Sequence, residues 1–590
     1  MCPYIRLGKS YAMLFLFGIF CFVLISSCMS KTAINTPKNE SQIETQPMTT
    51  STTSQESSSQ LVLGTNLTGI ADWSTEMPFI DAFKSSRQWI TQCESKEPGC
   101  SGSWNTKEFE KLDLDEYGWV KSLPKPEESA EYTRVGTLLF RGVERYPGGK
   151  YVVLYEGEGK IEYKFDARKD EAASVPGRDV IDVTPSKKGI YLAITETDPQ
   201  KTGNYIRNIR VVPAEYEATY SDEIFNPKFL EKINQFKALR FMDWMDTNNS
   251  EQSEWKNRPK VDKASYSYGG GVPIKIMVEL ANRLQVDPWF NMPHQATDEY
   301  FTNFASLVKE TVDPHLTIYV EYSNEVWNRQ FKQFDWVRDN GPVPGGKKSF
   351  QPYGVRTAQM CDIWKDVFGE ESHRVKCVMG TQTANPRVAG QVLNCDRWSE
   401  APCYEHGIDA LAITAYFSAG LGKPEYEEEI MAWLIDPTID EFAMAMSQLK
   451  DGSVLGTEGD NTSDLLERFN QYSQMAREKG LELVVYEGGS HVVGRKKVVN
   501  NQKITEFFIE LHRQPEFYDR YMEMLNAWKN TQGNRTVFMN FSNIRRPNKW
   551  GSWGVLEYVD QESSPRYDAL MDFIEQNNSK QISGEEAIGR

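Results

Sequence analysis

The chain has 590 residues, 39% of them hydrophobic and 12% aromatic, and carries a formal net charge of −17. This apolar content excludes a chain that is disordered throughout, and the single long apolar stretch excludes a protein with many membrane spans. The excess of 83 acidic over 66 basic residues disfavours nucleic acid as a partner, because binding to phosphates requires Lys and Arg. The balance suits a soluble protein with a neutral partner.

The N-terminal region has the pattern of an export signal. Residues 11–25 form the apolar stretch, which is short for a membrane span and has the length of a signal-peptide core. Residues 25–28, Ile-Ser-Ser-Cys, resemble the cleavage box of bacterial lipoproteins. The resemblance implies removal of residues 1–27, a lipid on Cys28, and attachment of an exported protein to the bacterial cell envelope, at the outer membrane or cell surface. The alternative is an uncleaved N-terminal anchor.

A tether is expected after the lipid site, over residues 28–60. From residue 29 onward this segment contains 14 Ser or Thr and no aromatic residue. Such a composition buries too little apolar surface to offset the entropy of ordering. We therefore expect a disordered segment that holds the folded part away from a membrane surface.

Six cysteines lie beyond the N-terminal region: Cys93, Cys100, Cys361, Cys377, Cys395 and Cys403. An even number in an exported chain indicates disulfides. Cys93 with Cys100 and Cys395 with Cys403 lie close together in loop-like sequence, so we predict both of these pairs. Cys361 and Cys377 fall on a predicted helix and strand and are either a third pair or two buried thiols. The chain has no C-x-x-C motif, and its His residues are scattered, so no metal site is expected.

From residue 61 onward, short apolar runs alternate with helical patterns. The expected strands are 61–66, 238–244, 289–293, 317–322, 375–380, 411–417, 481–486 and 536–541. The expected helices include 79–90, 273–284, 297–311, 355–368, 463–479 with Ser463 as N-cap, and 567–575. Eight strands alternating with helices predict a closed α/β fold, the (β/α)8 TIM barrel. An open doubly wound sheet is the alternative.

One segment interrupts this alternation. Residues 117–215 show only strand-like runs separated by Gly and Pro turns, at 136–140, 151–155, 161–165, 180–183, 190–195 and 205–212. This spacing is typical of an all-β sandwich, here jelly-roll-like. The predicted order is a first barrel unit (61–116), the inserted sandwich (117–215), the rest of the barrel (216–577) and a polar C-terminal tail (578–590).

Two glutamates directly follow predicted barrel strands. Glu325 comes after the fourth strand, in Asn324-Glu325-Val-Trp-Asn, and Glu487 comes after the seventh. In such a barrel the active site lies at the C-terminal ends of the strands. Carboxyl groups placed there cost desolvation energy unless they are paired. Two facing one mouth push their pKa values apart, which suits one as an acid and the other as a nucleophile.

This arrangement of Asn-Glu after strand four and Glu after strand seven resembles clan-A glycoside hydrolases, the retaining (β/α)8 glycosidases. The resemblance implies that Glu325 is the general acid/base, that Glu487 is the nucleophile, and that Asn324 binds the sugar 2-hydroxyl. It implies cleavage of a β-linked polysaccharide or oligosaccharide by double displacement, without a metal or organic cofactor.

Further residues near strand ends are candidates for substrate binding: Arg240, His294, Tyr416, His491, Trp550 and Trp553. The resemblance implies that Arg240 steadies the nucleophile, although a buried ion pair with Asp243 is the alternative. Tyr416 ends strand six, where clan members place a residue near the nucleophile. A Trp after strand eight offers a flat face for sugar stacking; Trp550 suits this role better, and Trp553 suits core packing. The two histidines are either substrate contacts or ordinary structural residues.

Departures from familiar motifs leave other functions open. Val326 follows the first glutamate where several clan families have Pro, so no individual family is indicated. One alternative is a catalytically inactive, carbohydrate-binding surface lipoprotein that uses the barrel or the insert. Another is an adhesin that binds through its insert. The insert itself is either a carbohydrate-binding module or, slightly favoured, a structural lid or spacer.

Overall fold

The computed structural model describes residues 62–588 except 95–96, 98–99, 101, 126–130, 347–348, 458 and 533–535, with side chains described to residue 577. The predicted signal peptide (1–27), the tether (28–60) and Cys28 lie outside the described residues. Within the described part, no helix combines the length and apolar character needed to cross a membrane.

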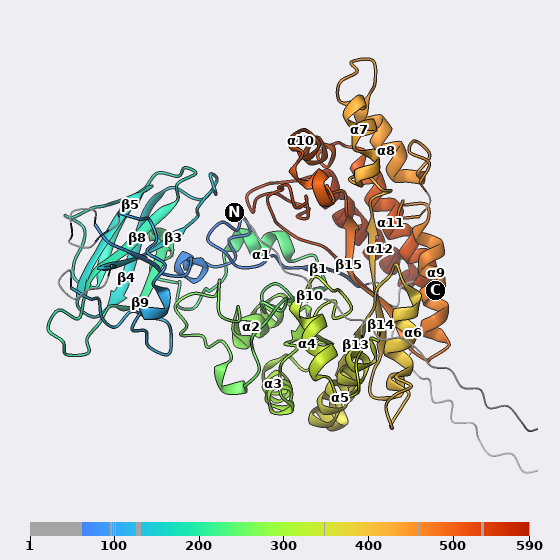
Figure 1. Ribbon diagram of the computed structural model, residues 1–590, viewed down its shortest axis with the longest axis horizontal. Helices are drawn as coiled ribbons and strands as arrows, with labels where there is room; N and C mark the ends of the chain where they lie inside the picture. Colours follow the sequence, from blue (N-terminus) through green and yellow to red (C-terminus); the bar gives the residue numbers. More distant parts are fainter. Residues whose placement is uncertain are drawn as a thin grey trace, which may run out of the picture. The chain divides into compact units, whose positions relative to one another are not determined.

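Eight parallel strands close into a barrel in the order β1-β10-β11-β12-β13-β14-β15-β16. They are β1 (Val62–Asn66), β10 (Ala238–Arg240), β11 (Asp287–Met292), β12 (Ile318–Tyr322), β13 (Val375–Gly380), β14 (Ala410–Phe417), β15 (Glu482–Ser490) and β16 (Val537–Asn540). Figure 1 labels β1, β10, β13, β14 and β15 of this barrel. Because β1 pairs with both β10 and β16, the sheet has no free edge. The predicted (β/α)8 barrel is confirmed, and the open sheet is excluded.

Helices follow the barrel strands along the chain. They are α1 (Pro227–Ile233), α2 (Ile274–Leu284), α3 (Asp298–Thr311), α4 (Lys332–Asn340), α5 (Gln351–Phe368), α6 (Pro386–Asn394), α7 (Glu427–Trp433), α8 (Glu441–Asp451), α9 (Leu465–Arg477), α10 (Gln502–Leu511), α11 (Phe517–Gln532) and α12 (Pro565–Ile588). Helix α3 shows why these segments are helical. The Thr297 side chain caps it by accepting a bond from the Tyr300 amide at 3.2 Å, and Tyr300, Phe304 and Val308 repeat every four residues on its buried face.

The insert is built from two antiparallel four-stranded sheets, with orders β2-β3-β8-β5 and β6-β7-β4-β9. Its strands are β2 (Ile90–Gln92), β3 (Arg134–Leu139), β4 (Gly149–Glu156), β5 (Gly159–Phe165), β6 (Ala167–Lys169), β7 (Arg178–Val183), β8 (Ile190–Thr197) and β9 (Arg207–Pro213). Alternate residues such as Leu192 on β8 and Val153 on β4 are fully buried in the main apolar core. The extra antiparallel sheets are consistent with the predicted insertion into the barrel.

The insert begins earlier in the chain than predicted. The expected helix over 79–90 is wrong: only a short 3-10 turn forms, at Ala82–Ser85. Ile90–Gln92 instead pairs with β3 as an edge strand of the sandwich. Ser86 takes an extended conformation, and the β-branched Ile90 and Thr91 favour a strand. The predicted boundary at 117 therefore falls inside the sandwich.

Two predictions about helix ends also need correction. Helix α9 begins at Leu465, and its N-cap position is held by Asp464 rather than Ser463. The Ser463 amide instead donates to the Lys450 carbonyl at 3.0 Å, so this residue belongs to the preceding loop. Helix α12 continues to Ile588, into the segment predicted as a tail over 578–590.

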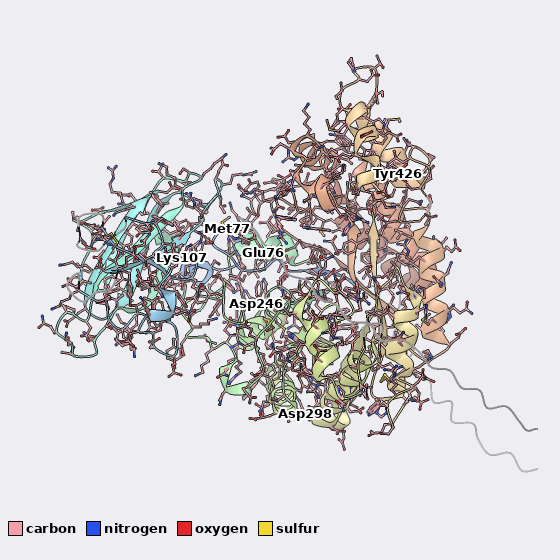
Figure 2. All side chains as sticks on the ribbon, in the orientation of Figure 1. Glu76, Met77, Lys107, Asp246, Asp298 and Tyr426 are labelled. Carbon is pink, nitrogen blue, oxygen red and sulfur yellow. A yellow bond between two sulfur atoms is a disulfide. The ribbon has the colours of Figure 1, made fainter. Side chains whose placement is uncertain are left out.

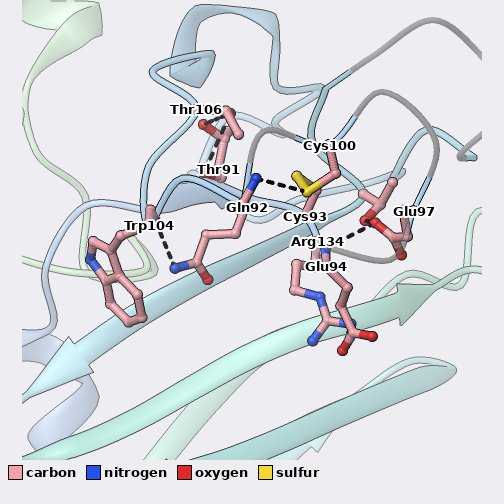
Figure 3. Close-up of a disulfide and its surroundings, with 11 residues drawn as sticks. Thr91, Gln92, Cys93, Glu94, Glu97, Cys100, Trp104, Thr106 and Arg134 are labelled. Atoms are coloured by element: carbon pink, nitrogen blue, oxygen red, sulfur yellow. Dashed lines mark hydrogen bonds and ion pairs between the residues drawn. A yellow bond between two sulfur atoms is a disulfide. The ribbon is translucent and has the colours of Figure 1, made fainter.

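All three cysteine pairs among the described residues are disulfides. Figure 3 shows Cys93–Cys100, which lies next to the sandwich strand β2. Cys395–Cys403 joins the end of α6 to a following turn. Cys361–Cys377 links α5 to barrel strand β13 with a Cα–Cα distance of 5.7 Å. The sequence left this third pair open, and the structure resolves it as a bond across the barrel wall.

Candidate active site

A fully buried arginine lies at the centre of the barrel mouth. Arg240 ends β10 and is 0% exposed. Its Nε and Nη2 donate to Glu321 Oε2 at 3.1 and 2.9 Å, and its Nη1 donates to Glu487 Oε1 at 2.9 Å. The remaining donors reach Asn66 Oδ1 at 3.0 Å and Asn324 Oδ1 at 2.9 Å. Five bonds match the five N–H groups of a guanidinium. Arg240 thus fixes four side chains, which come from β1, β12 with its end, and β15.

Glu487 is held from two sides. Arg240 bonds Oε1, and the Tyr416 hydroxyl at the end of β14 donates to Oε2 at 2.9 Å. The predicted proximity of Arg240 and Tyr416 to Glu487 is therefore present in the structure. The alternative pairing of Arg240 with Asp243 is not formed, since both ion pairs of this guanidinium in the described structure go to Glu321 and Glu487.

A bulge in β15 aims Glu487 into the barrel. The register runs from Val485 opposite Ile413 directly to Glu487 opposite Thr414, so Tyr486 is an extra residue without a partner on β14. A bulge of this kind breaks the strict alternation of side chains. As a result, two consecutive side chains both face the barrel interior. Tyr486 lies in the interior apolar cluster, and Glu487 bonds Arg240.

Glu325 sits on a constrained turn after β12. Ser323 has φ +60° and Glu325 has φ +42°, a left-handed conformation that residues other than Gly seldom adopt. Buried amides fix this turn: Asn291 Nδ2 donates to the Ser323 carbonyl at 2.8 Å, and Gln333 Nε2 donates to the Asn324 carbonyl at 2.9 Å. Strained backbone held by its surroundings is common at functional sites.

The Glu325 carboxylate receives two hydrogen bonds. Asn328 Nδ2 donates to Oε2 at 2.8 Å, and the Tyr486 hydroxyl donates to Oε1 at 3.0 Å. Tyr486 therefore links the two glutamates, because it precedes Glu487 in the chain and its hydroxyl bonds Glu325. The pair predicted from the ends of strands four and seven is thus assembled at one mouth.

Burial raises the pKa of both glutamates. For Glu487, the guanidinium of Arg240 opposes this rise, and the carboxylate of Glu325 adds to it. For Glu325, its hydrogen-bond donors oppose the rise in pKa caused by burial. When two carboxyls with raised pKa values interact, protonation of one favours the charged form of the other. The direct ion pair favours the negative charge on Glu487, which leaves the proton on Glu325.

Asn324 is oriented by the same arginine. Its Oδ1 accepts from Arg240, and its Nδ2 donates to Asn248 Oδ1 at 3.1 Å. Asn248 Oδ1 also accepts from Gln333 Nε2 at 2.8 Å. This network settles which way the amide points, with its NH₂ group turned away from the guanidinium.

Aromatic rings form a wall beside Glu487. Tyr416, His491 and Trp553 pack edge to face, with ring centroids 5.2–5.9 Å apart. A Cβ atom on Gly551 would lie 2.5 Å from the Trp553 ring, so only Gly leaves room for it. Trp553 is only partly buried, so the structure places it at the mouth as well as in packing.

The last two predicted residues are less closely tied to the carboxyl pair. His294 is 1% exposed, and its ring meets Gln295 and Trp336 rather than either glutamate in the described interactions. Burial lowers the pKa of His294 to about 4, so the ring is neutral. Trp550 is 60% exposed on the loop after β16, and its carbonyl accepts from Trp553 Nε1 at 2.9 Å.

Sequence reasoning missed Glu321 and Tyr486. Glu321 is 1% exposed, and its Oε2 accepts from Arg240, from Trp289 Nε1 at 3.0 Å and from Asn291 Nδ2 at 2.9 Å. A glutamate inside an otherwise apolar strand was the available signal, because a buried charge requires a partner. For Tyr486 there was no signal, since its role depends on the bulge. Among the described residues, no cluster of His, Cys, Asp and Glu suited to a metal ion occurs.

No protein-family model matches the chain, and no curated protein matches it. Solved structures with partial similarity include a GH51 arabinofuranosidase from Xanthomonas axonopodis pv. citri, with a TM-score of 0.34 and 12% identity over 59% of this chain and 66% of that chain. An exo-β-1,4-mannosidase from Opitutaceae bacterium strain TAV5 has a TM-score of 0.34 and 10% identity over 60% and 55%. A GH5-4 endoglucanase from Clostridium acetobutylicum has a TM-score of 0.33 and 12% identity over 59% and 89%.

The chain thus spans less than two thirds of the length of the first two of these proteins. Scores and identities this low do not establish a family. The barrel is established by its own strand topology.

Proposed function

We propose that the protein is a retaining glycoside hydrolase of the clan-A type, which cleaves a β-linked polysaccharide or oligosaccharide. The observation that carries the proposal is the pair of glutamates at the barrel mouth, with Glu487 bonded to Arg240 and Tyr416 and Glu325 bonded to Asn328 and Tyr486. The two carboxyls differ in their partners, which suits them to different roles.

In the first step, Glu487 attacks the anomeric carbon, and the bond to the glycosidic oxygen breaks. Glu325 gives its proton to that oxygen, so the leaving sugar departs as a neutral alcohol and Glu325 becomes a carboxylate. The ion pair with Arg240 keeps Glu487 negatively charged before the attack. Attack by a carboxylate with proton donation from a second carboxyl is the retaining mechanism, for which carboxyl separations are about 5–5.5 Å.

In the second step, water displaces Glu487 from the anomeric carbon. Glu325, now a carboxylate, takes a proton from the water as the oxygen attacks the anomeric carbon, and the bond to Glu487 breaks. Both glutamates return to their starting states. Asn328 and Tyr486 support this step, because each donates to a Glu325 oxygen and stabilises its charged form.

Substrate contacts follow from the surrounding groups. Asn324 Nδ2 has two hydrogens; Asn248 accepts one, and the other suits the sugar 2-hydroxyl. The partly exposed rings of His491 and Trp553 offer apolar faces for the C–H surface of a pyranose. Trp550, exposed on the same loop as Trp553, extends this surface.

An inactive carbohydrate-binding protein is the competing function. The pair of buried glutamates argues against it, because a buried carboxyl costs desolvation energy that pure binding does not require. Each glutamate has dedicated donors, which is expected where both protonation states take part in a reaction cycle.

The activity test is an assay of new reducing ends on β-glucan, mannan, xylan and galactan with the wild type, Glu325→Gln and Glu487→Gln. Glu299→Gln on the exposed start of α3 is the matched control. The proposal expects turnover of at least one polymer, losses of about 10³-fold or more in both site variants, and none in the control. Wild-type inactivity with retained polymer binding would favour the competing function.

Export and anchoring complete the proposal: residues 1–27 are removed, and Cys28 carries the lipid. The sequence around Cys28 supports this. Partition of the protein into detergent, with Cys28→Ala as control, tests it; the wild type should enter the detergent phase and the variant should not. Equal partition of both proteins would argue for an uncleaved anchor or for no lipid.

A further inference from the structure

An aromatic cluster lies on the sandwich, separate from the barrel mouth. Trp104 and Phe165 stack with ring centroids 5.9 Å apart and planes inclined by 25°. Tyr191 lies beneath them, with centroids 5.4 Å from Trp104 and 5.5 Å from Phe165. Trp104 is 49% and Phe165 is 46% exposed, whereas Tyr191 is buried. The Trp104 and Phe165 rings therefore face solvent side by side, and both pack on the buried Tyr191 ring.

The sheet is shaped to support this cluster. Along β8, Ile190, Leu192 and Ile194 join the main core, so the alternate residue Tyr191 lies on the opposite face of the sheet. A Cβ atom on Gly136 of the neighbouring β3 would lie 2.7 Å from the Tyr191 ring. A side chain at this position would therefore clash with the ring.

The loop that carries Trp104 is fixed at several points. Gln92 Nε2 donates to the Trp104 carbonyl at 2.8 Å, and Gln92 Oε1 accepts from the Tyr191 hydroxyl. The Cys93–Cys100 disulfide closes the segment just before Trp104 (Figure 3). After it, the Thr106 amide donates to the Thr91 carbonyl at 2.9 Å. The exposed indole is thus held in place by its backbone, as binding surfaces require.

Polar side chains near the cluster carry both signs of charge and are paired. Arg134 donates to Glu94 at 2.7 Å and to Glu162 at 3.1 Å. Lys164 lies 3.4 Å from Glu162. No single charge dominates, so the surroundings suit a neutral ligand with many hydroxyl groups better than a charged polymer.

The size of the surface favours a sugar over a protein. A stable protein interface buries about 800 Å² on each partner, and two half-exposed rings surrounded by ion pairs do not supply that. A flat ring instead matches the apolar C–H face of a pyranose, whose hydroxyl groups then reach the polar rim. Two neighbouring rings fit adjacent sugar units of one chain.

We propose that Trp104 and Phe165 form a second glycan-binding site, which holds a neutral polysaccharide chain on the sandwich without taking part in catalysis. This inference extends the proposed function, because the ligand belongs to the same chemical class as the substrate. It does not require that the glutamate pair be active, so the two proposals fail independently.

The test is affinity electrophoresis of the full chain in non-ionic detergent, through native gels containing β-glucan, xylan, glucomannan or galactan. At least one polymer should retard the wild type. Trp104→Ala and Phe165→Ala should raise the apparent Kd about tenfold or more, whereas Trp104→Phe should bind nearly as well as the wild type. Val175 is an exposed apolar residue of the same domain, so Val175→Ala is the matched control and should leave the apparent Kd unchanged. Hydrolysis of short soluble substrates should be equal in all these proteins.

Several results would overturn the inference. One is a wild type that no polymer retards; another is unchanged retardation in both Ala variants. If sedimentation shows a wild-type dimer that dissociates in Trp104→Ala, and polymer binding is unchanged, the cluster is a protein interface instead. Equal thermal midpoints of the variants exclude misfolding as the cause of lost binding. Retardation that depends on Trp104 in a chain without hydrolytic activity would support this site while refuting the proposed reaction.

Discussion

Arg240 and Glu487 form a buried ion pair, with 2.9 Å between Nη1 and Oε1 and 0% and 8% of the two side chains exposed. The same guanidinium bonds Glu321 at 2.9 Å. One positive charge thus sits between two carboxylates, and all three side chains are almost fully buried. The catalytic proposal depends on this geometry, because it holds the nucleophile charged and fixed.

Replacing Arg240 with Met should abolish activity and weaken the fold. Removing one partner of a buried ion pair costs about 3–5 kcal/mol, and here two buried carboxylates lose their partner together. We expect a loss of about 10³-fold in kcat/KM and a lower free energy of unfolding in urea. Arg240→Lys should recover part of the stability but little activity, because Lys lacks the planar fork that reaches both carboxylates. Full activity in the Met variant would contradict the role assigned to this pair.

Two Tyr→Phe variants should shift opposite limbs of the pH profile. The Tyr486 hydroxyl donates to Glu325 and lowers its pKa, so Tyr486→Phe should raise that pKa. Since the reaction needs protonated Glu325, the basic limb of kcat/KM should move to higher pH. The Tyr416 hydroxyl likewise lowers the pKa of Glu487, so Tyr416→Phe should move the acidic limb to higher pH, because the nucleophile must be charged.

Measurement of kcat/KM against pH for both variants and the wild type tests these two shifts. Movement of the same limb in both variants would show that the roles of Glu325 and Glu487 are not separated as proposed. A change in kcat/KM without movement of either limb would mean that the hydroxyls act only on position.

Glu76 should make stability depend on pH. Figure 2 labels this residue, which is 0% exposed, and burial raises its pKa from 4.5 to about 8. Its Oε1 accepts from Asn543 and from the Thr68 amide. A raised pKa contributes stability that is full below pH 4.5 and is lost as pH rises toward 8, by up to about 1.4 kcal/mol per pH unit. Glu76→Gln, which is neutral at every pH, should therefore be more stable than wild type at pH 8.

Urea unfolding of both proteins at pH 5 and pH 8 measures this difference. The advantage of Glu76→Gln should shrink between pH 8 and pH 5. An advantage of equal size at both pH values would mean that packing, not the charge of Glu76, limits stability.

The Cys361–Cys377 disulfide should stabilise the barrel. It closes a 16-residue separation between α5 and β13, for which loop entropy predicts about 3 kcal/mol. A variant with both cysteines changed to Ala should unfold at lower urea than wild type. The Cys395–Cys403 disulfide closes a shorter separation of 8 residues. A variant that lacks these two cysteines is the comparison, and its free energy of unfolding should fall by less. Equal losses would indicate that strain or packing outweighs loop length.

The barrel and its glutamate pair could be predicted because their signals are local. Parallel strands that are buried on both sides are apolar runs, and Glu325 and Glu487 interrupt the sequence where two of those runs end. The short strand Ile90–Gln92 was missed because three residues carry no periodicity, and its pairing with β3 spans more than forty residues of chain. Tertiary pairing, rather than local preference, decides such an edge strand.

The finer construction of the site depends on features that sequence does not encode locally. Tyr486 reaches Glu325 only because the register of β15 shifts at that residue. Glu321 pairs with Arg240 across the barrel interior, from a strand two places away in the sheet. His294 shows the reverse case: it follows a strand end, as a site residue should, yet its ring packs against Trp336.

The most direct test of the proposed retaining reaction is capture of its covalent intermediate. The protein would be incubated with activated 2-deoxy-2-fluoro glycosides of the glucose, mannose, xylose and galactose series, and its peptides analysed by mass spectrometry. A glycosyl ester should form on Glu487 with at least one of these compounds, and none should form in Glu487→Gln. A glycosyl ester on another residue, or hydrolysis of a matching substrate with inverted anomeric configuration, would contradict the proposed reaction.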